Sequence, residues 1–170
     1  MTVPVLTIVG KSGSGKTMLM EKIIKRLREK GYAIGTLKHH SHPGFDIDKP
    51  GKDSWRHARA GSEHVIIAAP DKIASYRLLA RELSFDEIIA EFSDLDLVLV
   101  EGYKSANQPA VEVIREDNGL ELITDTSQRI AVAADVEASR LNLEKKVPVF
   151  DLDDTESLVE MIEERFLESA

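Results

Sequence analysis

The chain of 170 residues contains no cysteine. This excludes disulfide bonds, cysteine zinc sites, iron–sulfur ligation and thiol catalysis, and it favours a reducing, cytoplasmic location. The sequence also lacks an apolar run near the roughly 18 residues of a membrane span. Its first nine residues show no cationic region of a signal peptide. The net charge is −8, from 22 basic and 30 acidic residues, so we expect neither membrane association nor nucleic-acid binding through a basic surface.

What is present is an alternation of short β-branched segments with amphipathic segments, which is typical of an α/β fold with a mostly parallel sheet. Strands are predicted at 3–9, 33–38, 95–100, 110–115, 130–134 and 147–150. Helices are predicted at 16–30, 53–60, after Ser84 and after Asp153 or Asp154. Segments 65–69 and 73–78, joined by three residues, predict one added β-hairpin. No linker divides the chain, which predicts a single domain over residues 1–170.

The first predicted strand leads into the first predicted helix through a glycine-rich segment that matches G-x-x-x-x-G-K-[ST] at every fixed position. Glycines let backbone N–H groups surround phosphate oxygens, and the helix N-terminus adds positive potential. This pattern predicts the three-layer sandwich of a P-loop NTPase. The residues expected to bind the nucleotide are Gly10, Ser12, Gly13, Ser14, Gly15, Lys16 and Thr17. Lys16 reaches the β- and γ-phosphates, and the Thr17 hydroxyl is a predicted Mg²⁺ ligand.

Two acids flank the strand predicted at 95–100, and only one of them can face the nucleotide. Asp96 starts the strand and Glu101 follows its end. Five extended residues separate them by roughly 16 Å, and ligands of open α/β sheets bind at the carboxyl ends of the strands. We therefore assign Glu101, not Asp96, as the acid that holds Mg²⁺ or orients an attacking water.

A long polar loop at residues 38–54 leaves the same edge of the sheet and holds three His, three Asp and three Lys. In one interpretation Asp46 or Asp48 contacts Mg²⁺, while substrate anions meet Lys38, Lys49 or Lys52. In a second, imidazoles form a transition-metal site at His39, His40 and His42. In a third, the loop is only an exposed polar segment, although unstructured loops of this length are often functional.

The residues alone do not decide between ATP and GTP. No Asn/Thr-Lys-x-Asp guanine-reading motif occurs anywhere in the chain. Asp135 follows the strand predicted at 130–134, so it lies at the correct edge of the sheet to receive a base. We therefore include Asp135 and Lys38 among the expected nucleotide-binding residues.

Three blocks in order resemble the molybdopterin-guanine dinucleotide biosynthesis adaptor family, called MobB. They are VGKSGSGKT, LKHHSHPGFDIDKPGKDSWRHARAG and LDLVLVEGYK. The resemblance implies a homodimeric P-loop protein that binds Mg²⁺–GTP and assists MobA, the guanylyltransferase that joins GMP from GTP to molybdopterin. It implies Asp48 and Glu101 as the acids near Mg²⁺, and GTP preference rests on the resemblance alone.

We predict a weakly hydrolysing GTP-binding adaptor, with Lys16 and Glu101 as the catalytic residues. No arginine in the first hundred residues is placed to stabilise the transferred phosphoryl group, unless Arg56 or Arg59 acts across a dimer, so slow turnover is expected. Three other readings stay open: an adaptor that delivers the nucleotide without cleaving it, a small-molecule kinase whose acceptor sits in the long loop, and a metallocentre-insertion NTPase.

Overall fold

The computed structural model describes residues 3–40, 44–103, 106–144 and 147–168. The chain separates into two compact units: unit 1 comprises residues 1–39 and 85–170, and unit 2 comprises residues 40–84. That residues 1–170 form a single domain stays a prediction. No helix in the described part of the chain is long and apolar enough to cross a membrane.

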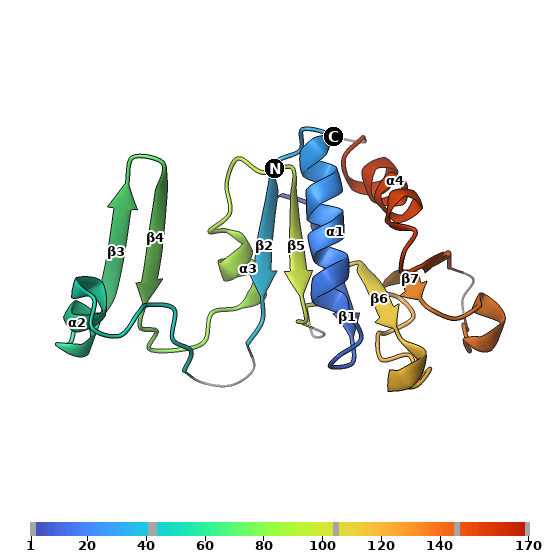
Figure 1. Cartoon of the computed structure of the whole chain (residues 1–170), viewed down its shortest axis with the longest axis horizontal. Coiled ribbons are helices and arrows are strands. Elements are labelled where there is room, and N and C mark those ends of the chain that lie inside the picture. Colours follow the sequence, from blue (N-terminus) through green and yellow to red (C-terminus); the bar gives the residue numbers. More distant parts are fainter. Residues whose placement is uncertain (1–2, 41–43, 104–105, 145–146, 169–170) are drawn as a thin grey trace. The chain divides into compact units, whose positions relative to one another are not determined.

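Unit 1 is built on a six-stranded sheet in the order β2-β5-β1-β6-β7-β8, and every pair in it is parallel. The strands are β1 (Val5–Gly10), β2 (Ile34–Lys38), β5 (Leu97–Glu101), β6 (Ala110–Ile114), β7 (Arg129–Ala134) and β8 (Val149–Asp151). All carboxyl ends therefore meet at one edge, and β1 lies between β5 and β6 (Figure 1).

Helices cover both faces of this sheet. On one face α1 (Lys16–Glu29) and α4 (Thr155–Phe166) lie side by side (Figure 1). Helix α1 packs on β1 and β5 and α4 on β8, and Ile23 and Leu158 are buried in the same apolar core. On the other face α3 (Phe85–Ile89) packs near Val98 and Val100. Apolar residues at helical spacing produce these contacts, because they place one stripe of each helix against the sheet. The result is the predicted three-layer α/β sandwich.

Unit 2 contains α2 (Asp53–Arg59) and an antiparallel hairpin of β3 (His64–Ala69) and β4 (Lys72–Arg77). Val65 is buried, while Ile66, Ile67 and Ile73 are exposed. The predicted hairpin is confirmed.

Every predicted strand and helix exists, with boundaries that differ by up to two residues at the starts of the strands. The predicted capping of the last helix is confirmed at Asp154, whose carboxylate accepts a hydrogen bond from the Ser157 amide at 3.2 Å. The predicted strand at 95–100 begins only at Leu97. Just before it, the Asp96 carboxylate accepts a hydrogen bond from the Ala33 amide at 2.7 Å, and the Asp96 amide donates to the Ala33 carbonyl at 2.8 Å.

Candidate functional site

The glycine-rich loop follows β1 directly and opens α1. A Cβ at Gly10 would lie 2.6 Å from the carbonyl oxygen of Val113, so only glycine fits this close approach between β1 and β6. Gly15 is the residue before α1 and has a left-handed backbone with φ of 91°. Both glycines therefore have a steric reason to be there, and they shape the loop that the sequence predicts as a phosphate cradle.

Two polar side chains of the loop turn inward. The Lys16 ammonium donates to the carbonyl oxygens of Gly10 at 3.1 Å and Lys11 at 2.8 Å, so it spans the loop. Ser14 is 1% exposed, and its Oγ has no hydrogen-bond partner in the described part of the chain. A buried hydroxyl without a partner is costly, and a phosphate oxygen would supply one. These features fit a bound phosphate group.

Glu101 joins two elements at the carboxyl edge. Its carboxylate oxygens accept hydrogen bonds from the Thr17 hydroxyl at 3.2 and 3.3 Å. The Lys38 ammonium lies 3.3 Å from the same carboxylate. The Glu101 side chain is 15% exposed, whereas that of Lys38 is 67% exposed. A hydroxyl beside a largely buried carboxylate is an oxygen donor set that suits Mg²⁺, so Thr17 and Glu101 would hold that ion.

A second wall of the site comes from the segments that follow β6 and β7. The Asn118 side-chain amide donates to the Ser12 backbone carbonyl at 3.2 Å. Lys11 donates to the Asn118 carbonyl at 3.1 Å and pairs with Glu121 at 3.0 Å. The segment after β6 therefore fastens the phosphate loop from the side opposite Glu101, a connection that the sequence analysis missed.

Arg115 and Asp135 lie at the ends of β6 and β7. Arg115 packs so closely on the phosphate loop that a Cβ at Gly15 would lie 3.2 Å from its Nη2 atom. Its Nη1 atom is 4.0 Å from Asp135 Oδ2, and Asp135 Oδ1 accepts a hydrogen bond from the Glu116 amide at 2.8 Å. Arg115 was not among the predicted site residues. Its position after a buried strand at the carboxyl edge was the available signal.

A buried ion pair supports this second wall. Glu112 in β6 is fully buried, and its carboxylate accepts hydrogen bonds from the Ile123 and Thr124 amides at 2.5 and 3.2 Å. Arg129 in β7 donates to the same carboxylate at 2.9 Å and also to the Thr124 carbonyl. The pair therefore holds residues 123–124, in the segment that connects β6 to β7, against these two strands. The charged residue inside the apolar sequence of β6 was the signal for it.

Asp48, predicted near Mg²⁺, lies in unit 2. Its carboxylate accepts hydrogen bonds from the Lys49 amide at 2.7 Å and the Tyr76 hydroxyl at 3.2 Å. A hydrogen bond with the Ser54 side chain, together with these two, lowers the pKa of Asp48 below its ordinary value. The structure thus shows Asp48 serving contacts within unit 2, and its place near the metal stays a prediction.

The proposed transition-metal site lies partly outside the described residues, because His42 falls there. Among the residues that are described, no three His, Asp or Glu side chains gather into a possible metal site. The His39 ring packs against Tyr103, with ring centroids 4.3 Å apart and the ring planes tilted by 38°.

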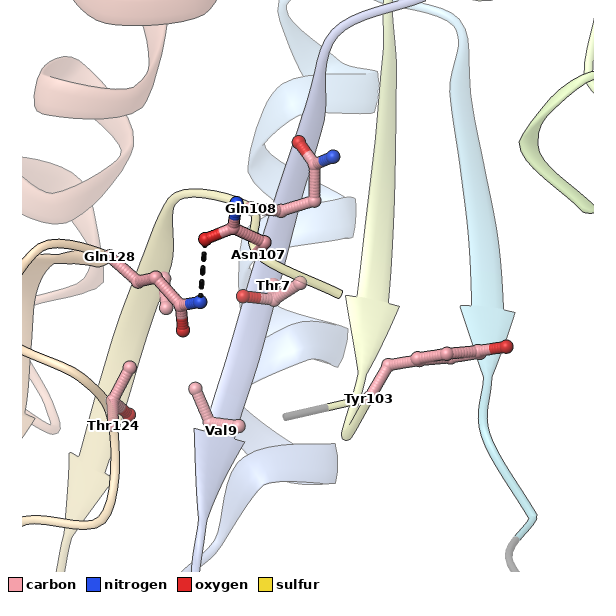
Figure 2. Close-up of a pocket in the computed structure, with 8 residues that line it drawn as sticks. Thr7, Val9, Tyr103, Asn107, Gln108, Thr124 and Gln128 are labelled. Atoms are coloured by element: carbon pink, nitrogen blue, oxygen red, sulfur yellow. Dashed lines mark hydrogen bonds between the residues drawn. The ribbon is translucent and has the colours of Figure 1, made fainter. Parts of the chain in front are cut away.

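A polar cavity between β1 and the segment before β6 is too small for a ligand (Figure 2). Its volume is about 10 Å³, near that of one water molecule and far below ligand pockets of roughly 300 Å³ or more. Gln128 donates to Asn107 at 3.0 Å across it. The side chains that line it include Thr7, Val9, Tyr103, Gln108 and Thr124.

A parallel sheet whose first strand enters a glycine-rich loop, with a carboxylate at the end of the adjacent strand, is typical of the P-loop class of α/β folds. Within that class, the chain belongs to the molybdopterin guanine dinucleotide synthesis protein B family, MobB, whose model matches residues 5–135.

Similar proteins support this membership. The chain is 36% identical to the molybdopterin-guanine dinucleotide biosynthesis adapter protein of Escherichia coli, over 95% of this chain and 93% of that protein. It is 40% identical to the adapter protein of Haemophilus influenzae, over 68% of this chain and 65% of that protein. The crystal structure of Bacillus subtilis MobB matches with a TM-score of 0.77 and 26% identity, over 97% and 99% of the chains.

Proposed function

We propose that this chain binds Mg²⁺–GTP in the loop Gly10–Thr17 and acts as an adapter in molybdopterin-guanine dinucleotide synthesis, in the cytoplasm. In this proposal it assists the guanylyltransferase that attaches GMP to molybdopterin. The proposal rests on the contact of Thr17 with Glu101. This contact places a hydroxyl at the start of α1 beside a carboxylate at the end of the adjacent strand, and these two oxygen donors suit Mg²⁺. The names of the relatives support the pathway.

The chemistry follows from the groups around the loop. Backbone amides and Lys16 bind the phosphate oxygens and stabilise charge that develops when water attacks the γ-phosphoryl group in line. Mg²⁺ would neutralise charge on the β- and γ-oxygens. Glu101, at the end of β5, would hold Mg²⁺ or orient the attacking water. Without an arginine supplied to the γ-phosphate, intrinsic turnover should stay below about 1 s⁻¹, the lower end of activated phosphoryl transfer.

The first test is calorimetric titration of the protein with GTP and ATP, with and without Mg²⁺, repeated with the molybdopterin-loaded guanylyltransferase. We expect a Mg²⁺-dependent preference for GTP that strengthens with the partner. Equal binding of ATP, or no effect of the partner, would contradict the proposal and favour a kinase or a metal-insertion protein.

Lys16→Ala tests the loop itself. We expect GTP affinity to fall by a factor of about 100 or more, because a charge-assisted contact to phosphate is lost. Lys25→Ala is the matched control, since Lys25 lies on the same helix and its side chain is 77% exposed. Unchanged affinity in Lys16→Ala would rule out the loop as the nucleotide site.

A further inference from the structure

The two sides of the phosphate loop carry different chemistry. On the side of β5, Thr17 and Glu101 form the oxygen pair suited to Mg²⁺. On the side of β6 and β7, Arg115 and Asp135 stand at neighbouring strand ends. If the metal-bound phosphates of a nucleotide in this loop lie beside Glu101, its ribose and base must extend away from β5. The carboxyl ends of β6 and β7 lie on that other side of β1.

Arg115 occupies an electrostatically unusual position. Its guanidinium lies against Gly15, at the N-terminus of α1, where the helix dipole already repels cations. Asp135 lies 4.0 Å away, and the Arg115 side chain is 37% exposed. Arg115 also helps to lower the pKa of Asp153, after β8, although Lys22 at 2.9 Å is the main cause. A planar cation held beside a phosphate loop offers a flat surface to a nucleoside.

Asp135 is held in a fixed orientation that leaves acceptor capacity. Oδ1 is fixed by the Glu116 amide, and Oδ2 faces Arg115 at 4.0 Å. The Asp135 side chain is 33% exposed. A carboxylate accepts only, so it pairs with a base that presents two adjacent N–H donors. Guanine does so with N1–H and its 2-amino group, whereas N1 of adenine is an acceptor.

We propose that Arg115 and Asp135 form the nucleoside side of the site, where Asp135 accepts both guanine donors and Arg115 packs its guanidinium plane against the nucleoside. This inference rests on the proposed function, because it requires the nucleotide to bind in the loop. It assigns GTP selectivity to residues that replace the missing guanine-reading motif.

Asp135→Asn gives the sharpest test, because asparagine retains an acceptor for the Glu116 amide while its NH2 group offers the base a donor in place of an acceptor. Xanthine carries a carbonyl where guanine carries the 2-amino group, so an asparagine that donates there should select it. We expect GTP affinity to fall about tenfold or more and XTP affinity to rise, so that the preference inverts. The matched control is Asp96→Asn, at the opposite edge of the sheet, which should preserve the wild-type preference.

Arg115 is tested with ligands that separate the nucleoside from the phosphates. Arg115→Ala should weaken GTP and GDP equally and leave inorganic tripolyphosphate binding unchanged. Arg115→Lys keeps the positive charge but lacks the planar guanidinium group, so it should weaken GTP and GDP binding as Arg115→Ala does. Arg28→Ala, near the C-terminal end of α1, is the control. Thermal unfolding of each variant checks that the fold is retained.

The outcomes separate this inference from the proposed function. If the wild-type protein binds neither GTP nor ATP, the proposed function fails and this inference fails with it. If the wild-type protein binds GTP but Asp135→Asn fails to improve XTP binding, Asp135 does not read the base. An equal loss of tripolyphosphate binding in Arg115→Ala would make Arg115 a phosphate ligand and overturn its assignment to the nucleoside.

Discussion

At the scale of single residues, Glu101 connects the hydroxyl of Thr17 with the ammonium of Lys38. We expect Glu101→Gln to reduce the Mg²⁺-dependent gain in GTP affinity by roughly tenfold to a hundredfold, in the range seen when groups that support a metal site are altered. Binding of GTP without Mg²⁺ should persist, because the variant removes a negative charge near the phosphates. Titrations with and without Mg²⁺ measure both quantities.

Asp96→Asn is the matched control for Glu101→Gln, because Asp96 lies near the other end of the same strand and its acceptor for the Ala33 amide survives in asparagine.

Glu101→Gln also distinguishes an adapter that only binds GTP from one that must hydrolyse it. If Glu101→Gln still stimulates the partner guanylyltransferase, the protein is an adapter that need not hydrolyse GTP. If stimulation disappears at a GTP concentration that saturates the variant, hydrolysis is part of its function.

Asp48 gives a prediction that depends on pH. Its pKa is lowered mainly by the hydrogen bond with Ser54, so the native state binds the Asp48 proton less tightly than the unfolded state does. The resulting stability is therefore present above the unfolded pKa of about 3.9 and is lost as pH falls through the lower native value. Ser54→Ala should raise the pKa of Asp48, as measured by NMR titration, and Ser75→Ala should not. An unchanged pKa of Asp48 in Ser54→Ala would show that the Ser54 hydrogen bond is not the main cause of the lowered pKa.

The sequence predicted Thr17 and Glu101 on one side of the candidate site and Asp135 on the other, but it missed Arg115 and Asn118. The positions of Thr17 and Glu101 followed from a contiguous motif and from the rule that ligands meet the carboxyl ends of strands. Arg115 and Asn118 contact the loop only because β6 pairs with β1, about a hundred residues away in sequence. Local pattern does not specify which strand becomes that neighbour.

At the scale of secondary-structure elements, hydrophobic periodicity was sufficient for the eight strands and four α-helices of the described residues, but not for the short 3₁₀ helices Glu116–Asn118 and Ala138–Arg140. Periodicity predicted the ends of the strands less accurately, because the residue at which a strand begins depends on its pairing with the neighbouring strand. Strand β7 was predicted from Ile130 but begins at Arg129, a residue type that is almost never fully buried unless it is paired. Its partner Glu112 lies 17 residues earlier, on the neighbouring strand. The pairing of β6 with β7, rather than either sequence alone, makes both charges acceptable in the core.

The Glu112–Arg129 pair should matter more for stability than any exposed pair. Glu112→Met or Arg129→Met leaves one buried charge without its partner, which costs about 3–5 kcal/mol of unfolding free energy. The double variant Glu112→Met/Arg129→Met should lose less than the sum of the two single changes, because no charge remains buried. Urea unfolding at neutral pH measures all three.

Glu121→Gln is the control for this cycle. Glu121 pairs with Lys11, but its side chain is 86% exposed, so we expect a change below about 1 kcal/mol. Strictly additive losses in the Glu112 and Arg129 variants would show that the two side chains act independently, and would remove the buried pair as the anchor of the segment between β6 and β7.

At the scale of the whole molecule, the net charge of −8 opposes the binding of anionic GTP. The long-range field of the protein therefore does not attract the nucleotide. Affinity must come from groups close to the phosphates, namely the loop amides, the N-terminus of α1 and Lys16. The same net charge repels a second copy of the chain, so a homodimer needs apolar contacts that overcome this repulsion.

Unit 2 offers such contacts on its hairpin. Within the described residues β3 and β4 pair only with each other, and a lone two-stranded hairpin is marginally stable in water. The register sets Ala68 opposite Ile73 and Ile66 opposite Ser75, so Ile66 and Ile73 share one face. Ile66 is 55% exposed and Ile73 is 70% exposed. Exposed apolar side chains and open strand edges favour association, which supports the predicted homodimer.

We therefore expect the wild-type protein to be a dimer in sedimentation equilibrium, and Ile66→Lys/Ile73→Lys to be monomeric. The added charges would have to be buried without partners in an interface formed by this face, whereas a monomer leaves them in water. Leu79→Lys, which is also exposed but outside both strands, should remain dimeric. A dimer that persists in the double variant would move the interface away from the hairpin. A wild-type protein that is monomeric at all concentrations would refute the homodimer itself.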